Sequence, residues 1–169
     1  ANATAMTGDN VCLPVTVNDF NNILGMQFSI NYDPAALVFT GTQNFNPALV
    51  GFTTVSGGNP NPGDLTFTWN DPFAAGVTLP NGATIFEVCF DVIGTATTTV
   101  TFSGMPTPIE VIDGDEMEVP FTGVPGTITI GAGESGTFAA SLSTVEACTG
   151  DTFCMNFTAS AFTNIKGMQ

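Results

Sequence analysis

Four cysteines are the residues of this sequence whose chemistry is easiest to define: Cys12, Cys89, Cys148 and Cys154. Cys12 and Cys89 each lie in a segment of alternating apolar residues, on the face opposite to those residues. Two outward-facing cysteines on neighbouring strands can form a disulfide, and buried free thiols are the alternative. A Cys12–Cys89 bond would close a loop of 89 − 12 = 77 residues. It would stabilise the fold by at most about 4 kcal/mol and would indicate an oxidising, extracellular compartment.

The pairing of Cys148 and Cys154 stays open at this point. These cysteines can bond to each other, or to cysteines that lie outside this chain. Four cysteines allow three different pairings, and the sequence does not choose among them. Their spacings, 77 and 154 − 148 = 6 residues, also differ from those of zinc-binding cysteine motifs.

Carboxylates are concentrated between positions 110 and 118. Calcium prefers hard oxygen ligands of this kind, so a calcium site at Asp113, Asp115 and Glu116 is one interpretation. The spacing of an EF-hand loop is missing, and a solvated hairpin turn is the alternative. No other cofactor is predicted. The cluster holds five of the 15 acidic residues: Glu110, Asp113, Asp115, Glu116 and Glu118.

Two Asn-x-Thr sequons, at Asn2 and Asn156, are candidate glycosylation sites. Asn156 shares one face of its segment with Cys154, and we expect it to be accessible. Trp69 and Tyr32 are the aromatic residues to consider for stacking on sugars. Apolar residues two positions away from each favour core packing instead. Glycans and host or cell surfaces are therefore secondary candidates as partners.

The composition excludes several function classes. Lys166 is the only basic residue, because Arg and His are absent. The chain therefore lacks an imidazole base and a Ser-His-Asp triad, and we predict that it is not an enzyme. A net charge of −14 leaves nothing to neutralise phosphates, which argues against nucleic acid as a partner. No apolar run approaches the roughly 18 residues of a membrane span, so no membrane insertion is expected.

Alternation of apolar and polar residues dominates the chain and predicts β-strands. In the clearest strand, Phe86, Val88, Phe90 and Val92 should face the core, and residues 56–64 read as a loop. Turn signals recur about every dozen residues, which is typical of an all-β sandwich. The nine expected strands cover 11–17, 26–32, 37–39, 65–69, 85–92, 97–102, 109–112, 117–121 and 126–130.

One segment of the sequence occurs twice. Residues 7–27 align without gaps with residues 149–169, at an offset of 149 − 7 = 142. We therefore expect a complete module at 1–130, a linker at 131–148 and the start of a second, incomplete copy at 149–169. The 11 identical pairs are Thr7/Thr149, Gly8/Gly150, Asp9/Asp151, Cys12/Cys154, Thr16/Thr158, Phe20/Phe162, Asn22/Asn164, Ile23/Ile165, Gly25/Gly167, Met26/Met168 and Gln27/Gln169.

The incomplete copy would carry an apolar face made of Phe153, Met155 and Phe157. An isolated two-stranded piece is marginally stable at best, so this face must pack against another part of the protein or against a partner. One possibility is that the chain continues and its later residues pack on this face. The other is strand addition to a neighbouring subunit, which would join subunits head to tail into a filament.

Several segments resemble cohesin-like domains. Domains of this kind occur in large secreted surface proteins of bacteria that are built from repeats. The resemblance covers about 9–130 and starts again at 149–169. Its most specific pieces are the Phe-x-Ile-x-Tyr-Asp-Pro strand end at 28–34 and the segment Ile85–Phe90. It implies a nine-stranded jelly-roll sandwich. Cysteines in these strands are not part of the cellulosomal pattern and are similar to those of repeat modules in secreted Bacteroidetes-type proteins.

The repeat and the resemblance together lead to a functional hypothesis. We expect a structural or adhesive module of an extracellular surface protein or filament, whose partners are like modules or subunits in a homopolymer or tandem array. One alternative is a cohesin-type protein-binding or carbohydrate-binding module. The other is a sandwich domain attached to a larger secreted hydrolase.

Overall fold

The computed structural model describes residues 1–131 and 139–160. They belong to two compact units, Ala1–Ala132 and Gly133–Gln169. The described part of the first unit contains a short 3₁₀ turn, η1 (Thr54–Ser56), and no α-helix. Its ten strands are β1 (Asn2–Met6), β2 (Asn10–Val17), β3 (Ile23–Tyr32), β4 (Leu37–Gln43), β5 (Gly57–Asn61), β6 (Asp64–Asn70), β7 (Ala83–Val92), β8 (Thr98–Ser103), β9 (Glu110–Asp113) and β10 (Gly126–Gly131).

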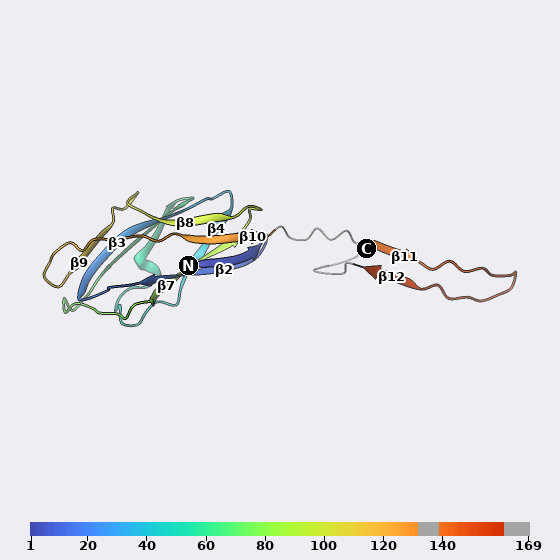
Figure 1. The fold of residues 1–169 in the computed structure, drawn as a ribbon, viewed down its shortest axis with the longest axis horizontal. Helices are drawn as coiled ribbons and strands as arrows, with labels where there is room; N and C mark the ends of the chain where they lie inside the picture. Colours follow the sequence, from blue (N-terminus) through green and yellow to red (C-terminus); the bar gives the residue numbers. More distant parts are fainter. Residues whose placement is uncertain (132–138, 161–169) are drawn as a thin grey trace. The chain divides into compact units, whose positions relative to one another are not determined.

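The strands of the first unit form two sheets around one core (Figure 1). The larger sheet has the order β1-β10-β8-β3-β6-β5, and β9 pairs with the start of β3. The smaller sheet has the order β2-β7-β4. Strands β1 and β10 run parallel, and all other pairs in the two sheets are antiparallel. This arrangement confirms the all-β sandwich that the sequence predicts.

The core lies between the two longest strands, β3 and β7. Phe86, Val88, Phe90 and Val92 of β7 are buried, as their alternation predicts. On β3 the buried set is Met26, Phe28, Ile30 and Tyr32. Residues two positions apart on a strand point to the same side of the sheet, so each strand lines the core with one continuous apolar face.

Phe86 occupies the centre of an aromatic cluster in this core. Its ring centroid lies 4.7 Å from that of Phe67, 5.3 Å from Phe52, 5.9 Å from Phe45 and 6.4 Å from Phe28. Phe28 and Phe67 come from neighbouring strands of the larger sheet, whereas Phe45 and Phe52 come from the connection that follows β4. Phe86 therefore joins both sheets and one long connection, and no part of it is exposed.

Two segments differ from the sequence-based expectations. Residues 57–61, expected as a loop, form strand β5, which pairs with β6 at the edge of the larger sheet. Residues 117–121, expected as a strand, make an isolated bridge between Ile112 and Glu118 and no assigned strand. The Val119 N–H donates to the Val111 carbonyl and the Asp113 N–H donates to the Met117 carbonyl, so the pairing of this segment with β9 is confined to the residues next to the turn.

The described part of the second unit, residues 139–160, contains one antiparallel pair. Strand β11 (Ala139–Leu142) pairs with β12 (Phe157–Ser160). The segment 131–148, expected as a linker, thus includes a strand. Phe157 begins β12, whereas Phe153 and Met155 precede it, and all three side chains are exposed. The part of the repeat at 161–169 lies outside the described residues.

Candidate functional site

The Cys12–Cys89 disulfide lies on the sheet β2-β7-β4. The two cysteines are directly opposite each other in the register of β2 and β7, with their Cα atoms 4.0 Å apart. They are bonded in the structure and link two adjacent strands across 77 residues of chain. Covalent closure of so long a loop restricts the unfolded chain more strongly than the folded one.

Side-chain amides flank this disulfide on both sides. The Nδ2 of Asn10 donates to Asp91 Oδ1 at 2.8 Å and to Thr40 Oγ1 at 3.2 Å. On the other side, Gln43 Nε2 and Asn44 Nδ2 both donate to Glu87 Oε2, at 2.9 and 2.8 Å. Amide donors thus satisfy the carboxylates beside the disulfide. We assign this surface a role in stability.

Cys148 and Cys154 are free thiols in the structure, and both are exposed. The backbone N–H of Cys148 donates to the Asp151 carboxylate at 2.8 Å, closing a short turn between the two cysteines. A disulfide between Cys148 and Cys154, or between either of them and a cysteine outside this chain, stays a prediction.

The acidic segment 113–118 forms a tight turn. The Asp113 carboxylate accepts hydrogen bonds from the backbone N–H groups of Asp115 and Met117, both at 3.0 Å. Over the described ranges 1–131 and 139–160, no group of three or more His, Cys, Asp or Glu side chains is placed to hold a metal ion. The geometry therefore gives no support to calcium at Asp113, Asp115 and Glu116, and that site stays a prediction.

A second turn of the same design, at residues 71–77, is missing from the sequence-based expectations. The Asp71 carboxylate accepts hydrogen bonds from the N–H groups of Phe73, Ala75 and Gly76, at 3.0, 2.9 and 3.0 Å. These backbone donors, that of Phe73 first, hold the pKa of the Asp71 carboxyl below its ordinary value. The signal was present as an Asp-Pro pair followed by a glycine, a typical turn sequence.

Asn22, at the start of β3, connects the two turns. Its carbonyl accepts a hydrogen bond from the Gly114 N–H at 2.7 Å, and the next residue, Ile23, exchanges two backbone bonds with Val77. A side chain at Gly76 or at Gly114 would collide with the Asn22 amide. The end of the Asn22 side chain would have to move to admit a Cβ at either position, and Gly76 in addition has a positive φ of 74°, which favours glycine.

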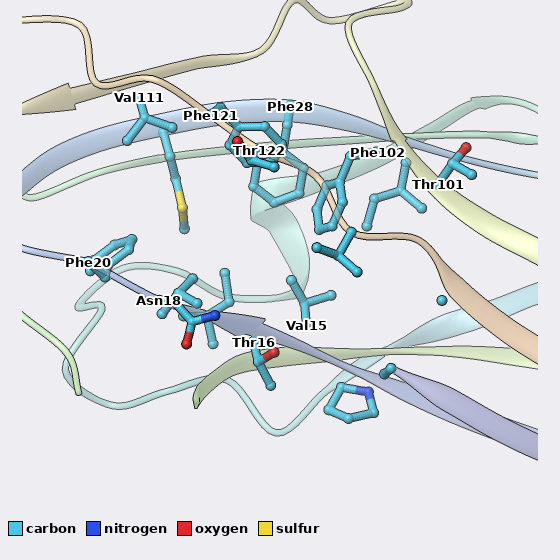
Figure 2. A pocket seen from close by; sticks show the side chains of 18 of the residues that line it. Val15, Thr16, Asn18, Phe20, Phe28, Thr101, Phe102, Val111, Phe121 and Thr122 are labelled. Atoms are coloured by element: carbon cyan, nitrogen blue, oxygen red, sulfur yellow. The ribbon is translucent and has the colours of Figure 1, made fainter. Parts of the chain in front are cut away.

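An apolar cavity of about 570 Å³ lies between the sheets beside β2. Figure 2 shows Phe28, Phe102 and Phe121 on one side of it, and Val15 and Phe20 on the other. Of the side chains that line it, Asp19 alone is ionisable. A catalytic acid–base pair needs two such groups within reach of one substrate, and the cavity provides one carboxylate. It is an apolar gap in the sandwich.

Strand β2 forms the rim of this cavity and an edge of the smaller sheet. Pro14 lies opposite Glu87 in the middle of the strand. Proline has no N–H, so a strand added outside β2 would lose a donor there. Proline on an edge is a common device against unwanted strand pairing. This edge is therefore poorly suited to strand addition.

The remaining candidate residues lie as follows. Asn2 and Asn156 of the two sequons are exposed. Trp69 and Tyr32 are buried in the core, and the Trp69 Nε1 donates to the Val50 carbonyl at 2.9 Å. The expectation that these two aromatics pack inward is correct, so neither forms a sugar platform.

Comparison with known families identifies this sandwich. The model of the family described as "Cohesin domain" matches residues 1–130. The chain belongs to the cohesin family. The structure and this match agree with the resemblance in the sequence.

Solved cohesin structures share the fold at low sequence identity. The solution structure of the cohesin CaCohA2 of Clostridium acetobutylicum has a TM-score of 0.65 at 20% identity, covering 79% of this chain and 88% of that one. A cohesin of the archaeon Archaeoglobus fulgidus, described as non-cellulosomal, gives 0.61 at 20%, with coverage of 79% and 88%. A type I cohesin–dockerin complex of Clostridium thermocellum gives 0.63 at 16%, with coverage of 76% and 94%.

No curated protein is significantly similar to this chain. In the part of the chain that the structure describes, no helix is both long and apolar enough to cross a membrane.

Proposed function

We propose that residues 1–130 act as a non-catalytic protein-binding module of a secreted protein built from tandem repeats. Membership of the cohesin family is the observation that carries this proposal. The Clostridium thermocellum relative is described in complex with a dockerin, which makes dockerins the first partner class to test. The Cys12–Cys89 disulfide supports an oxidising, extracellular location.

Binding to a panel of dockerin modules, measured by calorimetry, tests the proposal. We expect the full chain, and a chain that ends at Ala132, to bind at least one dockerin with equal affinity, because the family match lies within residues 1–130. A glycan panel serves as the comparison. Absence of dockerin binding, or binding only to glycans, would contradict the proposal.

Assembly with like modules is a second candidate. Phe153, Met155 and Phe157 are exposed in the second unit, although they align with Val11, Leu13 and Val15, which contribute to the core of the first unit. Analytical ultracentrifugation decides between the candidates. Concentration-dependent association of the full chain that disappears on ending it at Ala132 would favour assembly. If the full chain and the chain that ends at Ala132 are both monomers, assembly with like modules is excluded for this chain.

A further inference from the structure

One end of the sandwich presents apolar side chains to solvent. This end consists of the Phe73 loop (residues 71–77) and the Met117 loop (residues 113–118), which meet at Asn22. It lies where β9 pairs with the start of β3 (Figure 1). Phe73 is 72% exposed and Met117 is 64% exposed. The neighbours of Phe73, namely Pro72, Ala74 and Ala75, are exposed as well. Four consecutive exposed apolar residues are unusual on a surface without a binding role.

The Phe73 loop is ordered before any partner arrives. Three backbone N–H groups converge on the Asp71 carboxylate, and Ala74 has a positive φ of 48°. The lowered pKa of Asp71 agrees with this arrangement. An aromatic side chain on a fixed loop loses little conformational entropy when it binds, which is a common property of interface anchors.

Backbone strain is concentrated at the same end. Among the described residues, five non-glycine residues have positive φ, and three of them lie in these two loops or at Asn22. For Ala74 and Glu116 a conformation of this kind costs of the order of 1–3 kcal/mol, and such conformations tend to be kept at functional sites, whereas Asn adopts it readily. The three residues are Asn22, Ala74 and Glu116.

The charge around these side chains has one sign. Residues 1–131 contain no Lys, Arg or His, so no basic side chain of the first unit can pair with the carboxylates. Asp71 and Asp113 are engaged by their own loops, whereas Asp115 and Glu116 are exposed and their carboxylates accept no hydrogen bond within the described structure. The acidic residues of these two loops are Asp71, Asp113, Asp115, Glu116 and Glu118.

We propose that this end of the sandwich docks on a protein surface in which an apolar pocket is flanked by Lys and Arg. Phe73 enters the pocket, and Asp115 and Glu116 pair with the basic rim. An apolar anchor with charged residues in a neighbouring loop follows the usual anatomy of protein interfaces, and opposite charges across the interface set the partner's orientation and speed its association. The inference rests on the proposed protein-binding function and names the surface and the partner chemistry for it.

Selection of binders tests this inference independently of dockerins. The probe is a yeast-displayed library of a small helical domain with a randomised concave face, selected on the full chain. We expect most selected domains to bind Phe73→Ser at least about tenfold more weakly. Their randomised positions should be enriched in Lys and Arg over Asp and Glu. The matched control is Val55→Ser, since Val55 is 89% exposed on η1 and belongs to neither loop, and binding to it should be unchanged.

A charge variant completes the experiment. The selected domains should bind D115N/E116Q more weakly than the unmodified chain, and this binding should depend less on salt concentration between about 0.05 and 0.5 M. The variant Asp33→Asn should bind them like the unmodified chain. Selected domains that tolerate Phe73→Ser, or a selection without binders, would overturn the inference. The dockerin panel decides the proposed function separately, because a dockerin that binds Phe73→Ser normally would preserve that function while rejecting this surface.

Discussion

Replacing Phe86 by Ala is expected to lower the free energy of unfolding by about 3–5 kcal/mol. Phe86 is fully buried and lies within 6.4 Å, centroid to centroid, of four other phenylalanine rings. The substitution removes a large apolar side chain and leaves a cavity that the two sheets cannot close without moving. Urea unfolding followed by circular dichroism or fluorescence measures the change.

Phe73→Ala is the matched control for this prediction. It makes the same chemical change at a side chain that is 72% exposed, so we expect the free energy of unfolding to change by no more than about 0.5 kcal/mol. Equal effects of the two substitutions would mean that Phe86 is not in the centre of the core.

Replacing Cys12 and Cys89 together by Ser is expected to cost about 2–4 kcal/mol of stability. The bond closes 77 residues, a large part of the first unit, so its loss gives the unfolded chain much additional freedom. The same urea experiment, with and without a reducing agent, measures the effect. Reduction should destabilise the unmodified chain and should leave the double variant unchanged.

Cys148→Ser with Cys154→Ser is the control pair, because both thiols are free and belong to the other unit. It should leave the unfolding of the first unit unchanged. A double variant of Cys12 and Cys89 as stable as the unmodified chain would show that the disulfide contributes nothing to the fold.

The elements that the sequence predicts well are those with strict alternation. Phe86, Val88, Phe90 and Val92 face the core because a two-residue period allows one buried face only. The same reasoning placed Cys12 and Cys89 on the outer faces of their strands. Once β2 and β7 are neighbours, the two sulfurs meet.

Other elements depend on contacts that local patterns do not encode. Gly57, Gly58 and Pro60 have no strand propensity, and β5 exists because β6 offers an edge for pairing. The segment 117–121 alternates like a strand, but its pairing with β9 is limited to the bridge between Ile112 and Glu118. The meeting of the Phe73 and Met117 loops at Asn22 joins residues about 50 and 90 positions apart, which a reading of local motifs cannot reveal.

The redox state of Cys12 and Cys89 in the protein from its natural source tests the account most directly, because the proposed extracellular role depends on this bond. The chain has one basic residue, Lys166, so trypsin cannot separate the cysteines, whereas a protease that cleaves after Asp and Glu can. Mass spectrometry without reduction should find the Cys12 and Cys89 peptides linked. Recovery of both as free, alkylated thiols would contradict the account.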